Sequence, residues 1–206
     1  MDNLKIEVDR FIVFLKSIES TFVGLSFDDC HSFKVEIIQR SEAEAVFKSM
    51  KSNVVIMLYN YVEATVRKTM SDFYNKFNTS TCSYSEVILE LRKLWISSKV
   101  KDIKENTIVA DVFEMIENSI SQEFFISLDF EKDFSLSGNA DVRTIKEILY
   151  KHGVPFEESQ FSDYGGSLKS IKDMRNSLAD GNISFEENGK NLTVADIEKY
   201  RDHIYS

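Results

Sequence analysis

The chain has 206 residues, of which 43% are hydrophobic, and a formal net charge of −9. This length and apolar content suffice for one domain with a substantial core. One proline and seven glycines, with 29% charged residues, are typical of a mostly helical protein and exclude a predominantly β fold. The acidic balance excludes broad, non-specific binding to duplex nucleic acid, which depends on lysine and arginine, so any nucleic-acid contact is expected to be local.

The N-terminal residues carry acids where a targeting signal has a basic flank and an apolar core. These acids are Asp2, Glu7 and Asp9. The longest apolar run, residues 54–59, is too short to span a bilayer. We therefore expect a cytoplasmic protein without a membrane segment.

The cysteines and histidines do not form a metal-ligand pattern. Cys30 and Cys82 have no CxxC partner, so neither a disulfide framework nor a zinc site is predicted. His31, His152 and His203 each lack a neighbour at ligand spacing and are interpreted as surface or helix-end residues. We expect no metal and no other cofactor.

Apolar residues repeat at three- and four-residue steps in four segments of the first two thirds of the chain. Helices are predicted over residues 3–22, 41–77, 85–97 and 107–128. The second has nearly ten turns and is expected to be the central helix. Gly24 is expected to end the first helix, and polar connectors are expected at residues 28–32 and 99–105.

A loop and a further helix are predicted next. Residues 135–140 include Gly138 and Asn139, which are typical of a loop. Asp141 then occupies the position of an N-cap or first-turn acid for a helix that ends at Gly153, before Pro155.

The last part of the chain is predicted to form a helix, a turn and a terminal helix. The helix begins at Gly165-Gly166-Ser167 and ends at Gly181. Alternating apolar residues and the tight-turn dipeptide Asn188-Gly189 favour a small β-hairpin near residues 183–193. Thr193 and Asp196 resemble a helix start. We interpret residues 1–206 as one all-α domain with N-terminal helices in 1–140 and the motif helix, hairpin and terminal helix in 141–206.

The segment at residues 175–185, RNSLADGNISF, resembles the signature of the HEPN superfamily, an arginine followed after four to six residues by a histidine and often written RNxxxHG. Residues 58–64, LYNYVEA, are similar to the YNxxE pattern on an early helix of HEPN-like nucleases in prokaryotic defence loci. A weaker similarity is the sequence Ser137-Gly138-Asn139 before the helix that ends at Gly153.

The resemblance implies an all-α bundle with a long central helix that dimerises so that two such motifs meet in a cleft. The family cuts RNA without a metal, by attack of the 2′-hydroxyl on the adjacent phosphate, and its members act as toxins or antiviral effectors. Arg175 would bind the phosphate and the charge of the transition state. Asn176 would help to position Arg175, with Asn60 and Glu63 in supporting roles.

The chain departs from the family pattern at Asp180, which stands at the histidine position. An unperturbed aspartate, with a pKa of about 3.9, is an anion and a weak base at neutral pH. It would also repel phosphate and lie at the negative end of a helix dipole. We therefore predict little or no ribonuclease activity. Natural decay and a substitution introduced so that a toxic protein could be produced both account for the aspartate.

Helix geometry separates the two motif positions. On an ideal helix, Arg175 and Asp180 lie about 140° apart. They can act on one target if the helix ends between them, which Gly181 would allow, or if a second protomer contributes one of them.

The sequence allows two interpretations for each of three further side chains. Glu63 either forms an i,i+4 pair with Arg67 on an exposed helix face or lies beside Arg175. Lys169 and Lys172 either guide an RNA strand or belong to a solvated helix face.

The sequence thus predicts a HEPN-type endoribonuclease scaffold of a bacterial toxin or antiviral defence system, inactive as written. The alternative is a non-catalytic helical module for dimerisation and for binding RNA or protein. The expected partners are a second copy, joined through the helix that carries Arg175 and Asp180, an RNA, and an antitoxin or other defence-system protein.

Overall fold

The computed structural model describes residues 2–22, 40–136, 138, 140–162 and 164–205. In these residues the regular structure is helical, and the only β-type pairing is one isolated bridge between Ser83 and Phe125. The predicted all-α class is therefore confirmed. The predictions for Gly24, residues 28–32, Ser137 and Asn139 concern positions outside the described residues, as do those for Cys30 and His31.

The chain divides into two compact units. We call Met1–Ala64 with Phe161–Ser206 the motif unit, because it contains the segment at residues 175–185, and we call Thr65–Gln160 the middle unit. Helix α2, Arg40–Thr79, contributes residues to both.

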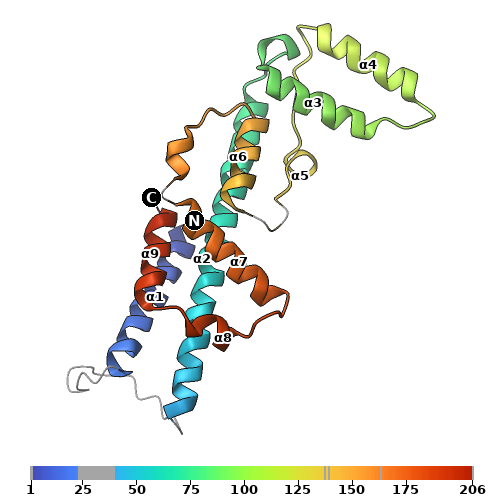
Figure 1. The fold of residues 1–206 in the computed structure, drawn as a ribbon. Coiled ribbons are helices and arrows are strands. Elements are labelled where there is room, and N and C mark those ends of the chain that lie inside the picture. The colour runs from blue at the N-terminus through green and yellow to red at the C-terminus, as the bar shows by residue number, and fades with distance from the viewer. Residues whose placement is uncertain (1, 23–39, 137, 139, 163, 206) are drawn as a thin grey trace. The chain divides into compact units, whose positions relative to one another are not determined.

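In the described residues, the motif unit contains four helices besides the first part of α2 (Figure 1). They are α1 (Asp2–Phe22), α7 (Gly165–Ala179), α8 (Phe185–Lys190) and α9 (Val194–Tyr205). The predicted helices at residues 3–22 and 41–77 are confirmed with nearly the same ends. Their periodic apolar positions form the core, in which Val8, Ile12, Leu15, Val54, Val55, Leu58, Tyr59, Ile171, Val194 and Ile197 are buried.

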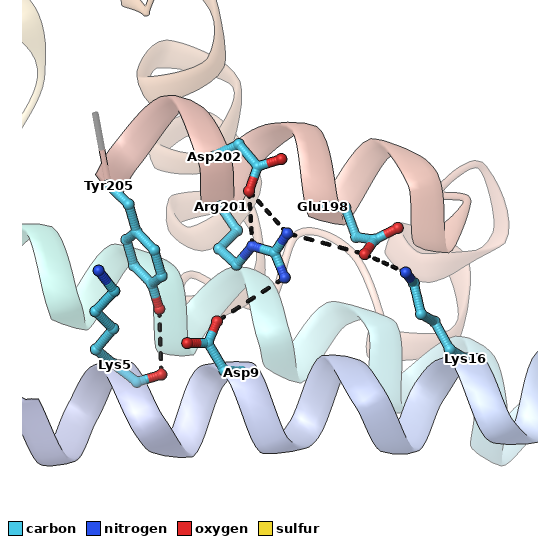
Figure 2. Close-up of polar contacts among 7 residues, drawn as sticks. All are labelled: Lys5, Asp9, Lys16, Glu198, Arg201, Asp202 and Tyr205. Atoms are coloured by element: carbon cyan, nitrogen blue, oxygen red, sulfur yellow. Dashed lines mark hydrogen bonds and ion pairs between the residues drawn. The ribbon is translucent and has the colours of Figure 1, made fainter.

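Helices α1 and α9 lie side by side and are joined by polar contacts at the edge of this core (Figure 2). Arg201 of α9 lies 3.9 Å from Asp9 of α1, and Lys16 of α1 pairs with Glu198 of α9. The hydroxyl of Tyr205 donates to the carbonyl oxygen of Lys5 at 3.3 Å. Partly exposed ion pairs each contribute only about 0–1 kcal/mol, so the buried apolar residues supply most of the stability of this contact.

The predicted β-hairpin near residues 183–193 is wrong, because this segment forms the short helix α8. The side chain of Ser184 accepts a hydrogen bond from the backbone N–H of Glu187 and caps the helix. Gly189 is not a turn residue: a Cβ atom added there would lie 1.9 Å from the carbonyl oxygen of Lys48 on α2. The glycine therefore serves the close approach of α8 to α2 rather than a reversal of the chain.

Buried polar groups hold α8 and the residues after it on α2. Ser52 donates to the carbonyl oxygen of Phe185 at 2.6 Å and accepts from the side-chain amide of Asn188 at 3.0 Å. The ammonium of Lys51, which is 7% exposed, donates to the carbonyl oxygen of Leu192. Burial lowers the pKa of Lys51, and the charge of Glu19 opposes this effect.

The middle unit contains the end of α2 and a series of shorter helices. They are the 3-10 helix η2 (Tyr84–Glu86), α3 (Leu89–Asp102), α4 (Ile108–Ile120), α5 (Phe130–Asp133), α6 (Val142–Lys151) and the 3-10 helix η3 (Glu158–Phe161), whose last residue belongs to the motif unit. Helix α4 has no buried residue, and its exposed large apolar residues are Ile108, Val109, Phe113, Ile116 and Ile120.

Two predicted boundaries in the middle unit are wrong. The expected helix at residues 107–128 ends at Ile120, and the expected connector at 99–105 begins inside α3. Residues after Ile120 form other hydrogen bonds: Ile126 donates its N–H to Cys82, and the amide side chain of Asn78 bonds both backbone groups of Leu128. These tertiary bonds replace the helical ones.

The caps of α6 and α9 agree with the sequence. The carboxylate of Asp141 accepts from the N–H of Thr144, and Gly153 follows α6 with φ +67°. Thr193 and Asp196 form a reciprocal capping box at the start of α9.

Candidate functional site

Helices α2 and α7 place Arg175 against Tyr59 in the motif unit. Leu168, Ile171 and Leu178 are buried and fix the orientation of α7, while Arg175 is half-buried beside this stripe. The guanidinium carbon of Arg175 lies 4.9 Å from the ring centroid of Tyr59, which is fully buried. This is the geometry of a cation–π interaction.

Asn176 makes the second contact of Arg175. The Nη1 atom of Arg175 donates to the side-chain oxygen of Asn176 at 3.1 Å. A guanidinium has five N–H donors, so this bond and the stacking on Tyr59 leave donors that can bind the oxygens of a phosphate. Asn176 therefore contacts the residue that the sequence analysis expected it to position.

The C-terminus of α7 has the hydrogen bonds of a Schellman motif. Gly181 has φ +70°, its N–H donates to the carbonyl oxygen of Leu178, and the N–H of Asn182 donates to that of Ser177. Glycine is favoured at this position because the left-handed conformation is unfavourable for a residue with a Cβ atom. The glycine of the motif thus ends the helix directly after position 180.

Asp180 caps this end and is exposed. Its φ of −79° and ψ of −5° remain right-handed helical, and its N–H donates to Asn176 at 2.9 Å. Helix α7 ends at Ala179, but the backbone of Asp180 keeps helical angles and a helical hydrogen bond, so the end of the helix does not by itself redirect position 180. Among the residues that the structure describes, no hydrogen bond or ion pair joins the two side chains.

The supporting residues lie on the same two helices. Asn60 is exposed and Glu63 is half-buried on α2. Lys169 is exposed on α7, while Lys172 is half-buried and lies 4.0 Å from Asp173.

The relation of this chain to known proteins agrees with the motif. The HEPN_MAE_28990-like HEPN family model matches residues 1–206. The chain belongs to this HEPN family. No curated protein and no solved structure matches it significantly. The predicted membership of the HEPN superfamily is confirmed, and the HEPN chain has the nuclease-like helical scaffold of its family.

Tyr59 belongs to the candidate site through its contact with Arg175, and the sequence predicted no role for it. The YNxxE similarity included it, but its burial at a core position of α2 concealed its contact with a charged residue. The available signal was the tyrosine immediately before Asn60, because a buried aromatic ring beside a motif can support an arginine.

A second polar contact of the HEPN chain lies at the start of α7. The hydroxyl of Ser167, which is 7% exposed, lies 2.7 Å from Nδ1 of His203 on α9. The ring of Tyr164 meets that of His203 edge to face, with centroids 5.7 Å apart. His203 is thus a half-buried residue that joins α9 to α7, and not only a helix-end histidine.

Among the described residues of the HEPN chain, no group of three or more His, Cys, Asp or Glu side chains has the geometry to hold a metal ion. In the same part of the chain, no helix combines the length and the apolar character needed to cross a bilayer.

Proposed function

We propose that this HEPN chain is the scaffold of a metal-independent endoribonuclease from a bacterial toxin or antiviral defence system, and that Asp180 leaves it with little or no activity. The observation that carries the proposal is Arg175 held between Tyr59 and Asn176, about 1.4 turns before Asp180. RNA is the proposed ligand, and the cytoplasm is the proposed location.

Arg175 has the chemistry of a phosphate ligand. Its charge is permanent, and the ring of Tyr59 restricts the orientation of the guanidinium before an RNA arrives. Such preorganisation favours the interaction with the charge that develops on phosphate in the transition state.

Asp180 has the opposite properties at the general acid/base position. Aspartate side chains ordinarily carry a negative charge near neutral pH, so an exposed aspartate at this position would repel an approaching phosphate. A histidine would exchange a proton with the 2′-hydroxyl or the leaving oxygen in this pH range.

A homodimer is part of the proposal. Because Asp180 keeps helical backbone angles, the position lies about 140° around α7 from Arg175. A second copy that packs through α7 would supply position 180 to the Arg175 of its partner. A monomer in light scattering at micromolar concentration would contradict this composite site.

The test compares RNA cleavage by the chain and by its Asp180→His variant in EDTA. We expect cleavage by the histidine variant alone, and its loss when Arg175→Met is added. Asp173→His is the matched control, because Asp173 is another exposed acid of α7. Metal-dependent cleavage by the aspartate form would overturn the mechanism.

Asp180 itself favours a second candidate, a non-catalytic module that uses the dimer cleft to bind RNA or a protein such as an antitoxin. Silence of both the aspartate and the histidine forms, with RNA binding that depends on Arg175, would select this candidate.

A further inference from the structure

Helices α3 and α6 of the middle unit form a groove of about 300 Å³. Its lining residues are Glu90, Lys93, Leu94, Ser97, Tyr150 and Lys151. Leu94 is 3% exposed and provides an apolar base, whereas the side chain of Tyr150 is 79% exposed. The groove therefore presents an aromatic ring to solvent above an apolar surface.

The turn after α6 holds this groove in shape. A Cβ atom added to Gly153 would lie 2.3 Å from Cδ1 of Ile88 and 3.3 Å from the side chain of Glu90. The turn is thus packed tightly on the start of α3, two to three residues beyond the lysine and tyrosine that line the groove. A backbone that is already fixed beside Tyr150 removes the cost of ordering a loop when a partner binds.

The two helices are locally basic in an acidic chain. In α3, Arg92, Lys93, Lys99 and Lys101 outnumber Glu90 and Asp102, which gives 4 − 2 = +2. In α6, Arg143, Lys146 and Lys151 outnumber Glu147, which gives 3 − 1 = +2. The pair therefore carries +4, whereas the whole chain carries −9.

In the described part of the chain, the two lysines of the groove are not engaged by acidic side chains, unlike two other basic residues of α6. Arg143 pairs with Glu147, and Lys146 pairs with Glu158. Among the described residues, Lys93 and Lys151 form no ion pair or hydrogen bond through their ammonium groups. Unpaired lysines beside an exposed ring match a ligand that alternates flat groups with negative charges.

Single-stranded RNA has this alternation of bases and phosphates, and proteins bind it by stacking bases on aromatic side chains and placing cations along the backbone. We propose that the groove between α3 and α6 binds single-stranded RNA, with a base on Tyr150 and phosphates at Lys93 and Lys151. This rests on the proposed function in that RNA is the ligand, but it assigns a binding surface separate from the Arg175 motif.

The test is a fluorescence-anisotropy titration of the full chain with a labelled single-stranded RNA of mixed sequence. Tyr150→Ala is expected to weaken binding about tenfold, since stacking on one aromatic side chain contributes about 1–3 kcal/mol. Tyr150→Phe keeps the ring and is expected to stay within about twofold of the parent chain. Equal affinity of the parent and Tyr150→Ala would overturn the proposal.

The lysines are tested through the salt dependence of binding. Each lost phosphate contact reduces the magnitude of the negative slope of log K against log salt by about 0.7 for a single strand, so Lys93→Gln with Lys151→Gln should reduce that magnitude by about 1.4. Tyr150→Ala should leave the slope unchanged. Lys101→Gln is the matched control, because this exposed lysine of α3 does not line the groove. An unchanged slope in the double variant would overturn the role of the lysines.

Two comparisons separate this proposal from its alternatives. If a polyglutamate peptide displaces the RNA and binds equally well to Tyr150→Ala, the groove is a site for acidic protein segments and the proposal fails. If Asp180→His shows no cleavage but RNA binding still depends on Tyr150, the groove proposal stands and the nuclease proposal falls. If Asp180→His cleaves RNA but RNA binding does not depend on Tyr150, the nuclease proposal stands and the groove proposal falls.

Discussion

The guanidinium of Arg175 lies over the buried ring of Tyr59, with 4.9 Å between the guanidinium carbon and the ring centroid. The two residues are far apart in the sequence and come from α7 and α2, so the contact depends on the packing of the two helices. It links the stability of the fold to the position of the motif arginine, and this link can be measured.

Replacing Arg175 by methionine should lower the free energy of unfolding by about 1 kcal/mol, because the cation–π interaction is lost while most of the side-chain volume remains. Urea unfolding measures the effect. Lys169→Met, at an exposed position of the same helix, should change the free energy of unfolding by less than about 0.5 kcal/mol. Equal effects of the two substitutions would contradict a stabilising contact between Arg175 and Tyr59.

Gly181→Ala should destabilise the chain by about 1–2 kcal/mol through its backbone conformation. Gly181 has φ +70°, while a Cβ atom added there would meet nothing within 4 Å, so a steric clash contributes nothing. Gly181→Asn should have a smaller effect, since asparagine adopts left-handed angles more readily. Thermal unfolding of the three proteins ranks them, and a larger loss for asparagine than for alanine would contradict the explanation.

Ser52→Ala should lower the free energy of unfolding by about 1–3 kcal/mol, because the part-buried carbonyl of Phe185 and the buried side-chain amide of Asn188 lose their partner. Ser49→Ala is the control on the same helix. The hydroxyl of Ser49 bonds only the carbonyl oxygen of Ala45, one turn earlier, so its removal should be nearly neutral. Urea midpoints compare the two, and an equally small effect of both would show that the polar contacts of α8 do not stabilise the fold.

His152 should make the fold less stable as the pH falls below about 6.5. Its Nδ1 lies 2.7 Å from the carbonyl oxygen of Ile148 and therefore carries the proton, while Nε2, 3.0 Å away, accepts from the hydroxyl of Tyr74. Burial lowers the pKa of His152 below its ordinary 6.5. The charge of Lys151 lowers this pKa further, whereas the hydrogen bond to Ile148 raises it.

The unfolded chain therefore binds a proton in a pH range where the folded chain does not. The contribution of His152 to the free energy of unfolding is fully present above the pKa that His152 has in the unfolded chain. It is lost as the pH falls through the lower pKa that His152 has in the folded chain. Urea unfolding between pH 7.5 and 5.5 should show a smaller pH dependence for His152→Gln than for the parent chain. Identical pH profiles would contradict the effect.

Phe113→Ser in α4 should change the free energy of unfolding by less than about 0.5 kcal/mol, because this side chain is 63% exposed. Ile171→Ala, at a fully buried position of α7, should lower it by about 2–5 kcal/mol. Chemical unfolding measures both. A large loss for Phe113→Ser would mean that α4 packs against another surface in solution.

Much of the fold was predictable because the relevant signals are local. The stripe of Val8, Ile12 and Leu15 predicted α1, and the pair of Thr193 and Asp196 predicted the start of α9. Gly181 predicted the end of α7, since its left-handed conformation follows from the lack of a Cβ atom. Each of these features depends on residues within about one or two helical turns.

The errors arose where distant residues compete with local propensity. Asn188-Gly189 has the composition of a tight turn, but Ser52, 136 residues away from Asn188, bonds this segment in a helix on α2. The residues after Ile120 continue an apolar pattern, yet Asn78 bonds the backbone of Leu128, 50 residues away. Sequence periodicity does not contain these partners.

The sequence by itself determined the helical class, the HEPN motif and the presence of Asp180 in place of a histidine, because residue identity and spacing define all three. Only the tertiary structure decided that Tyr59 supports Arg175 and that Asp180 keeps helical backbone angles at the end of α7. Those properties depend on how α2 packs against α7 and on the backbone angles at the helix end, which contacts between distant residues stabilise.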